Sequence, residues 1–238
     1  MPLPASPKST LISMAIACTA LAGCVPSGHT AVVLIDRSAS IAPADRALYA
    51  QSLGALAPEL DAGGRVLVAA VGDAGRSDFL PLFDRRVAES DMRLVQEDEI
   101  AAARQAMADA IPALLPETPQ PGARSTRILE TIAAAAQAFG PAADDGDTLV
   151  ILSDGLEDSP AIYLARLATG KAAIDAALER AREQGLLPNL AGVRIHLVGT
   201  GGDGTRIGVT GVDAFWGAYA GATGATIAQI GRLPFAPK

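Results

Sequence analysis

Three side chains that can offer hard oxygen ligands follow one another closely near the start of the sequence. Asp36, Ser38 and Ser40 are separated by single residues, and they directly follow the apolar run Ala31–Ile35. Such a run predicts a buried strand, whose end would deliver one carboxylate and two hydroxyl groups into a single turn. Oxygen groups of this kind suit a divalent cation such as Mg²⁺. We therefore predict half of a metal site here, and the rest of the chain must supply the other half.

Two later positions could complete this site. Thr126 lies at the start of a predicted helix, and Asp154 follows an apolar run, with Gly155 directly behind it. Each feature has an ordinary structural explanation, because hydroxyl side chains cap helices and an Asp-Gly pair forms tight turns. The occurrence of all these features in one order, on these kinds of elements, favours a shared cation site.

The ordered set resembles the metal-ion-dependent adhesion site of the von Willebrand factor type A (vWA) domain family. That family has an Asp-x-Ser-x-Ser motif, then a distant Thr, then a distant Asp that is usually followed by Gly. By this resemblance, Ser38 and Ser40 would bind the metal through their hydroxyl groups, and Thr126 would bind it directly or through water. Asp36 and Asp154 would act largely through bound waters.

The resemblance covers about residues 30–230 and implies what the site does. Neutral hydroxyl ligands leave a cation short of negative charge, so an Asp or Glu carboxylate of a partner protein would take the open coordination position. Mg²⁺ is the expected metal, with Mn²⁺ and Ca²⁺ as alternatives. Ser125 competes with Thr126 for the threonine position. Thr126 is preferred because Ile128 follows it at the family's usual offset.

Strand-like and helix-like segments alternate along most of the sequence and predict the elements that must hold these residues. Apolar runs predict strands at 31–35, 66–71, 79–83, 148–153, 193–198 and 226–230. Apolar periodicity predicts helices at about 43–60, 97–115, 128–139, 171–184 and 212–222. Residues 84–96 show no regular pattern, and Pro112 is expected to kink the second helix or to end it early.

This alternation predicts a three-layer, doubly wound α/β fold of the Rossmann-like type that vWA domains have. The sheet should be mainly parallel. The segment with Pro81 should be an antiparallel edge strand, because its connection from Val71 is short and proline is confined to sheet edges. Ligands of such sheets bind outside the carboxyl ends of the strands, where Asp36 and Asp154 are expected to lie.

The first residues have the features of a targeting segment. Lys8 is the only charged residue of 1–24, and an apolar run leads to Leu21-Ala-Gly-Cys24. This end resembles the lipobox of bacterial lipoproteins, in which the cysteine is acylated. We predict a signal peptide at 1–23, lipidation at Cys24, a membrane tether at 24–30 and a vWA domain at 31–238. Because Val25 is not Asp, the periplasmic face of the outer membrane is the expected location in a two-membrane bacterium; an ordinary secretory signal with a chance cysteine is the alternative.

Composition excludes some classes of function. The chain has 238 residues, of which 50% are hydrophobic, and a formal net charge of −7. That size and apolar content suit one domain with a large core. The negative charge argues against nucleic acid, which needs a basic surface. Both cysteines lie within the first 24 residues, so neither a disulfide framework nor a Cys-ligated zinc site is expected.

Several other chemistry-bearing residues have simpler explanations. The acidic segment 144–147 lacks the rest of a calcium-binding loop and is expected to be a solvated turn. Glu157 and Asp158 are expected to be surface acids on a loop. The aromatic and histidine residues are expected to be structural, with Phe215, Trp216, Tyr219 and His196 in the interior and His29 on the surface.

Three enzyme interpretations fit less well than a binding module. Segment 199–204 matches Gly-x-Gly-x-x-Gly, but it comes late in the sheet and no convincing helix follows at once. A phosphatase with Asp36 as nucleophile would need an acid at position 38, where the sequence has Ser. A serine hydrolase would need a Gly-x-Ser-x-Gly turn, which the sequence lacks, and neither histidine has a convincing partner.

The sequence therefore predicts a membrane-anchored domain, not an enzyme, that binds another protein in a metal-dependent way at the bacterial cell envelope. Two alternatives stay open. The chain could be a structural subunit of an envelope assembly, in which the metal only braces the loops. It could also be a metal-dependent hydrolase, which is the less favoured of the two.

Overall fold

Six strands form one sheet in the order β3-β2-β1-β4-β5-β6. The computed structural model describes residues 28–38, 41–72, 79–116, 125–140, 145–164, 170–201 and 209–236. The strands are β1 (Thr30–Asp36), β2 (Arg65–Val71), β3 (Pro81–Arg86), β4 (Thr148–Leu152), β5 (Arg194–Val198) and β6 (Thr226–Gly231). All neighbouring pairs are parallel except β2 and β3, which are antiparallel. The predicted mainly parallel sheet with one antiparallel edge strand is thus confirmed.

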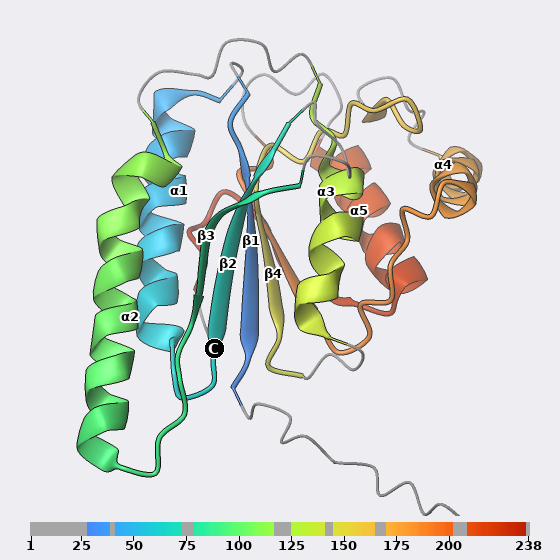
Figure 1. The fold of residues 1–238 in the computed structure, drawn as a ribbon. Coiled ribbons are helices and arrows are strands. Elements are labelled where there is room, and N and C mark those ends of the chain that lie inside the picture. The colour runs from blue at the N-terminus through green and yellow to red at the C-terminus, as the bar shows by residue number, and fades with distance from the viewer. Residues whose placement is uncertain are drawn as a thin grey trace, which may run out of the picture.

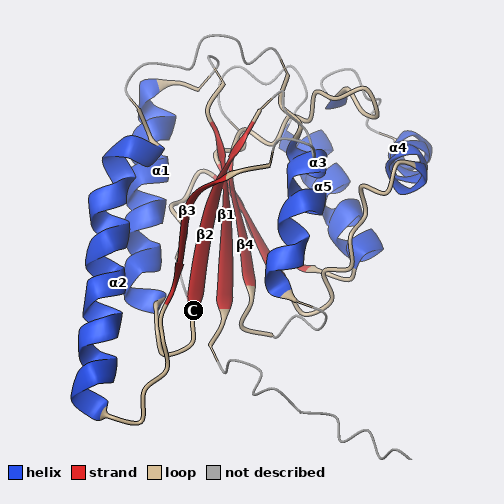
Figure 2. Cartoon of the chain, in the orientation of Figure 1, coloured by secondary structure: helices blue, strands red, loops and turns tan. Residues whose placement is uncertain are grey.

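Helices cover both faces of this sheet (Figure 1). The helices α1 (Pro43–Leu56) and α2 (Arg93–Leu114) lie on one face, and α3 (Ile128–Ala135), α4 (Lys171–Glu183) and α5 (Val209–Thr223) lie on the other. Figure 2 shows the resulting helix–sheet–helix layers. The fold is a three-layer, doubly wound α/β fold.

The central strands are apolar throughout because both of their faces are buried. Along β1, Val32 and Leu34 belong to the core beneath α3, α4 and α5. Val33 and Ile35 alternate with them and belong to the core beneath α1 and α2. This alternation is what a strand between two helix layers requires.

Most boundaries agree with the predicted ones to within a residue, and the larger differences are the following. The α1 helix ends at Leu56 and continues as a 3₁₀ turn at Ala57–Glu59. Segment 84–96 is irregular only at 87–92, because β3 extends to Arg86 and α2 begins at Arg93. Pro112 lies inside the last turn of α2, where a proline removes only one backbone hydrogen bond, so the helix continues past it. The α5 helix begins at Val209 rather than at residue 212.

The chain order makes β1 and β4 the centre of the molecule. The strand order reverses at β1: β2 and β3 follow on one side of it, and β4, β5 and β6 follow on the other. Such a reversal opens a crevice at the carboxyl ends of the two strands, where open α/β sheets bind ligands. In the described part of the chain, no helix is both long enough and apolar enough to cross a membrane.

Candidate functional site

Asp36 is the last residue of β1, and its carboxylate is held at both oxygens. Its Oδ1 accepts a hydrogen bond of 2.8 Å from the backbone N–H of Ser38. Its Oδ2 accepts one of 3.0 Å from the hydroxyl group of Ser153. The side chain is only 3% exposed. The carboxylate is therefore fixed in orientation at the end of the strand.

Ser153 connects the two central strands at this end of the sheet. It directly follows β4 and is fully buried. Its hydroxyl oxygen donates to Asp36 and accepts a 3.2 Å hydrogen bond from the backbone N–H of Gly155. Ser153 is not among the site residues predicted from the sequence. Its place immediately before Asp154, at a strand end, is the signal that could have identified it.

Asp154 lies near Asp36, and the charge of Asp36 disfavours ionisation of the Asp154 carboxyl group. The Oδ1 atom of Asp154 accepts a 2.9 Å hydrogen bond from the backbone N–H of Leu156. Burial raises the pKa of Asp154, and the charge of Asp36 raises it further. Burial also raises the pKa of Asp36, against the hydrogen bonds from Ser38 and Ser153. Among the described residues, no Lys or Arg forms a salt bridge with either carboxylate.

Thr126 joins the start of α3 to the loop that follows β4. Its carbonyl oxygen accepts a 2.9 Å hydrogen bond from the backbone N–H of Asp158. The neighbouring Ser125 hydroxyl instead accepts a 3.4 Å hydrogen bond from the Arg127 side chain. In Figure 1, α3 begins at the end of the sheet where β1 and β4 finish. Thr126 thus belongs to the same end of the molecule as Asp36 and Asp154.

Glu157 is fully buried, so its prediction as a surface acid was wrong. Its Oε2 accepts a 3.0 Å hydrogen bond from the backbone N–H of Leu129 in the first turn of α3. No side chain at the N-cap position of α3 accepts such a bond, so a residue from another segment does so. Burial raises the pKa of Glu157 to about 7, although hydrogen bonds oppose the rise. Glu157 therefore fixes α3 to the loop that carries Asp154.

Two glycines allow close packing around this loop. Gly155 has φ of +79°, and its carbonyl oxygen accepts a 3.0 Å hydrogen bond from the indole N–H of Trp216. Gly199, after β5, has φ of +117°. A Cβ atom there would lie 2.7 Å from the carbonyl oxygen of Ser153 and 2.8 Å from the hydroxyl oxygen of Tyr49. The backbone segments at the ends of β1, β4 and β5 thus pack closely against one another beside Asp36 and Asp154.

The structure brings four of the predicted metal residues to one end of the sheet. Asp36, Ser38, Thr126 and Asp154 lie on β1, the turn after it, the segment before α3 and the loop after β4. Ser40 and the predicted lipidation residue Cys24 lie outside the described residues. Within the described residues, no cluster of three or more His, Cys, Asp or Glu side chains could hold a metal. Cation binding would therefore need the two carboxylates together with hydroxyl oxygens.

Other predictions have mixed outcomes. The aromatic residues of α5 are buried as predicted, and His196 is buried in β5 while His29 is exposed. Asp147 is not part of a solvated turn, because it is 4% exposed and accepts a 2.7 Å hydrogen bond from the backbone N–H of Thr30. Of the glycine-rich segment 199–204, the last three residues lie outside the described part.

Comparisons with known proteins assign no family to the chain. No protein-family model matches it. No curated protein sequence matches it. Among solved structures, it is similar to a von Willebrand factor type A protein from Catenulispora acidiphila, with 16% identity over 86% of this chain and 39% of that one, and a TM-score of 0.44. It is also similar to the manganese-loaded TRAP protein of Plasmodium vivax, with 14% identity over 85% and 68% of the two chains and a TM-score of 0.41.

A third similar structure is the PilB minor pilin of Streptococcus sanguinis, with 14% identity over 86% and 57% of the two chains and a TM-score of 0.42. The chain thus spans about two fifths of the Catenulispora structure and less than two thirds of PilB. Similarity at this level carries no argument about a metal, a partner or an activity. The fold class rests on the strand order and the layers themselves.

Proposed function

We propose that this chain is a vWA-type domain that binds a partner protein through a divalent cation held at the carboxyl end of its sheet. The observation that carries the proposal is the pair of carboxylates at the ends of the two central strands, the buried Asp36 and the half-buried Asp154. Burial and mutual repulsion raise the pKa of Asp154, and no described cation pairs with either group. A divalent cation would supply the missing positive charge.

The hydrogen bonds of the site suit the role that the vWA resemblance implies for each residue. Both oxygens of Asp36 already accept protein hydrogen bonds, which suits a carboxylate that acts on the metal through water. Asp154 has one oxygen engaged with the loop backbone. Hydroxyl groups of Ser38, Ser40 and Thr126 would supply direct ligands. The cation would provide an electrophilic centre that accepts a carboxylate from the partner.

Mg²⁺ is the metal we favour, because the proposed ligands are all hard oxygens on a rigid frame. Titration of the purified chain with Mn²⁺, followed by electron paramagnetic resonance, tests the site directly. Asp36→Asn keeps the shape of the side chain and removes its charge, so metal affinity should fall by about tenfold or more. Asp98→Asn on the exposed surface of α2 is the matched control. Equal Mn²⁺ affinity in all three proteins would contradict the proposed site.

The proposed partner is a protein that presents an Asp or Glu side chain. Affinity capture from a membrane extract, with and without chelator, should recover a partner only when metal is present and Asp36 is intact. Capture that survives both chelation and Asp36→Asn would instead favour a structural subunit of an envelope assembly. Metal-dependent turnover of a substrate that is lost in Ser38→Ala would favour the hydrolase alternative.

We further propose that the domain is lipid-anchored at Cys24 in the bacterial cell envelope, on the periplasmic face of the outer membrane where there are two membranes. The support is the sequence Leu21-Ala-Gly-Cys24 after an apolar run. More than one acyl chain gives a stable anchor, whereas a single chain gives a marginal one. Cys24→Ser should move the protein from the membrane fraction to the soluble fraction. Unchanged membrane recovery of this variant would contradict acylation at Cys24.

A further inference from the structure

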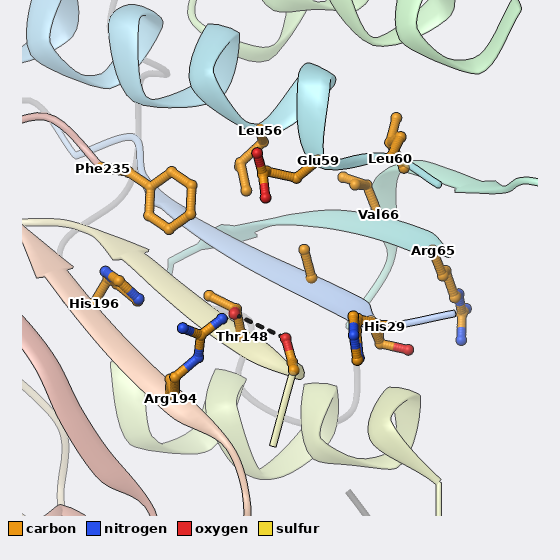
Figure 3. Close-up of a pocket in the computed structure, with 13 residues that line it drawn as sticks. His29, Leu56, Glu59, Leu60, Arg65, Val66, Thr148, Arg194, His196 and Phe235 are labelled. Carbon is orange, nitrogen blue, oxygen red and sulfur yellow. Dashed lines mark hydrogen bonds between the residues drawn. The ribbon is translucent and has the colours of Figure 1, made fainter. Parts of the chain in front are cut away.

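A cavity of about 170 Å³ lies at the amino end of the sheet, opposite the candidate cation site. It is bordered by the first residues of β1, β4 and β5, by the end of α1 and by the C-terminal Phe235. Figure 3 shows the guanidinium group of Arg194 on one side of this cavity and Phe235 and Leu56 across from it. One wall is therefore cationic, and the facing wall is apolar apart from Glu59, which lies beside Leu56.

Arg194 is an unusual side chain for this position. It is the first residue of β5 and lies beside Thr148 in the sheet. Its Nε atom is buried and has no hydrogen-bond acceptor among the described residues. No described carboxylate forms a salt bridge with it, whereas Arg65 at the same end of the sheet pairs with Asp84 at 2.6 Å. The Nε atoms of Arg37 and Arg85 are also buried without an acceptor, but of these three arginines only Arg194 lines the cavity, where its N–H groups can meet an anionic ligand.

The other walls restrict what that anion can be. Leu56 is 2% exposed, Val66 2% and Phe235 5%, and the Phe235 ring packs edge-on against His196 with centroids 4.8 Å apart. These side chains suit the apolar body of a ligand, whereas His29, Thr30 and Thr148 line a polar part of the cavity. Glu59, an exposed residue, also lines the cavity on the side of Leu56, where its carboxylate would repel a second negative charge on a ligand.

We infer that this cavity is a binding site for a small monocarboxylic acid with a compact apolar body, held by Arg194. The planar guanidinium matches a carboxylate in geometry and can donate two parallel hydrogen bonds to it. A cavity of about 150 Å³ accommodates a molecule the size of benzene. The ligand is thus about the size of benzoate, and a free acid fits this volume better than the end of a peptide. The inference is independent of the cation site at the other end of the sheet.

The test is a titration of the purified chain with 4-fluorobenzoate, followed by ¹⁹F NMR. Saturable binding is expected, and neutral 4-fluorobenzamide should bind about tenfold more weakly or worse because it lacks the charge that Arg194 recognises. Arg194→Gln should weaken 4-fluorobenzoate binding by a similar factor. Arg182→Gln, on the exposed surface of α4, is the matched control and should bind like the wild type.

The comparison of the acid with the amide uses the wild-type chain, so it stands even if Arg194→Gln fails to fold. Absence of saturable 4-fluorobenzoate binding would overturn the inference. So would equal binding of acid and amide, or a folded Arg194→Gln variant with wild-type affinity. Tighter binding of N-acetylphenylalanine than of benzoate would overturn the assignment to a small free acid and point to a chain terminus.

Discussion

Glu157 should make the stability of this protein fall as the pH rises towards neutrality. The side chain is 0% exposed, and burial raises its pKa from an ordinary value of 4.5 to about 7. Between these two values the folded chain binds a proton that the unfolded chain has released. The unfolded state therefore binds fewer protons, and the free energy of unfolding decreases as the pH increases.

The magnitude follows from the size of the pKa difference. At about 1.4 kcal/mol for each tenfold change, the rise from 4.5 to about 7 corresponds to a loss of about 3 kcal/mol. The loss should be complete above pH 7 and absent below pH 4.5. Glu157→Gln keeps an oxygen that can accept from the backbone N–H of Leu129, but it cannot ionise. The variant should therefore gain about 3 kcal/mol relative to the wild type as the pH rises through this window.

Urea unfolding followed by the fluorescence of Trp216 measures this effect, because the chain has a single, fully buried tryptophan. The difference in unfolding free energy between wild type and variant is the informative quantity, since titrations common to both proteins cancel. Glu183→Gln, on the exposed surface of α4, controls for the loss of a glutamate. Parallel pH profiles for wild type and Glu157→Gln would refute the reasoning. A wild type that gains stability relative to Glu157→Gln as the pH rises would show that the helix N-terminus stabilises the ionised form more than burial destabilises it.

Three further outcomes are expected. Gly199→Ala should lower the free energy of unfolding in urea by about 1–3 kcal/mol, because φ is +117° and the new Cβ would lie 2.7 Å from the Ser153 carbonyl oxygen. The control is Gly140→Ala, which should cost less. Gly140 has φ of +77°, but a Cβ atom there would meet no atom within 4 Å. Trp216→Phe should cost at least about 1 kcal/mol in urea unfolding followed by circular dichroism, because the carbonyl oxygen of Gly155 loses its indole donor; fluorescence cannot report on this variant, since it has no tryptophan. Mg²⁺ at about one hundred times its dissociation constant should raise the unfolding free energy by about 3 kcal/mol, and chelator should reverse this; an unchanged denaturation curve would count against the cation site.

The fold could be predicted because a strand that is buried on both faces has an uninterrupted apolar sequence. Segment 31–35 is apolar without interruption, and its residues alternate between two cores in the structure. Pro81 and a short connection identified the antiparallel edge strand. Parallel strands place their ends together, so the order of motifs was enough to bring Asp36 and Asp154 to one edge.

The hydrogen bonds around the site could not be predicted, because they join residues far apart in the sequence. Ser153 donates to Asp36 across 117 residues, and Asp147 accepts from Thr30 across the same interval. The position of Glu157 in the sequence predicts only an acidic loop residue. Its hydrogen bond to the first turn of α3, which has no side-chain cap of its own, is evident only in the structure. The sequence gives the type of each residue, but it does not give the distant residues that contact the side chain and bury it.

The two ends of the sheet have different surroundings, and the proposed anchor would give them different roles. β1 begins at Thr30, beside the Arg194 cavity, and ends at Asp36, six residues later. At about 3.3 Å per residue, these ends lie about 20 Å apart. A chain from Cys24 to Thr30 spans at most about 20 Å, so acylation at Cys24 would hold the amino end of the sheet close to the membrane. The cation site would then point away from the bilayer, where a partner protein can reach it, and the acid-binding cavity would lie on the membrane side.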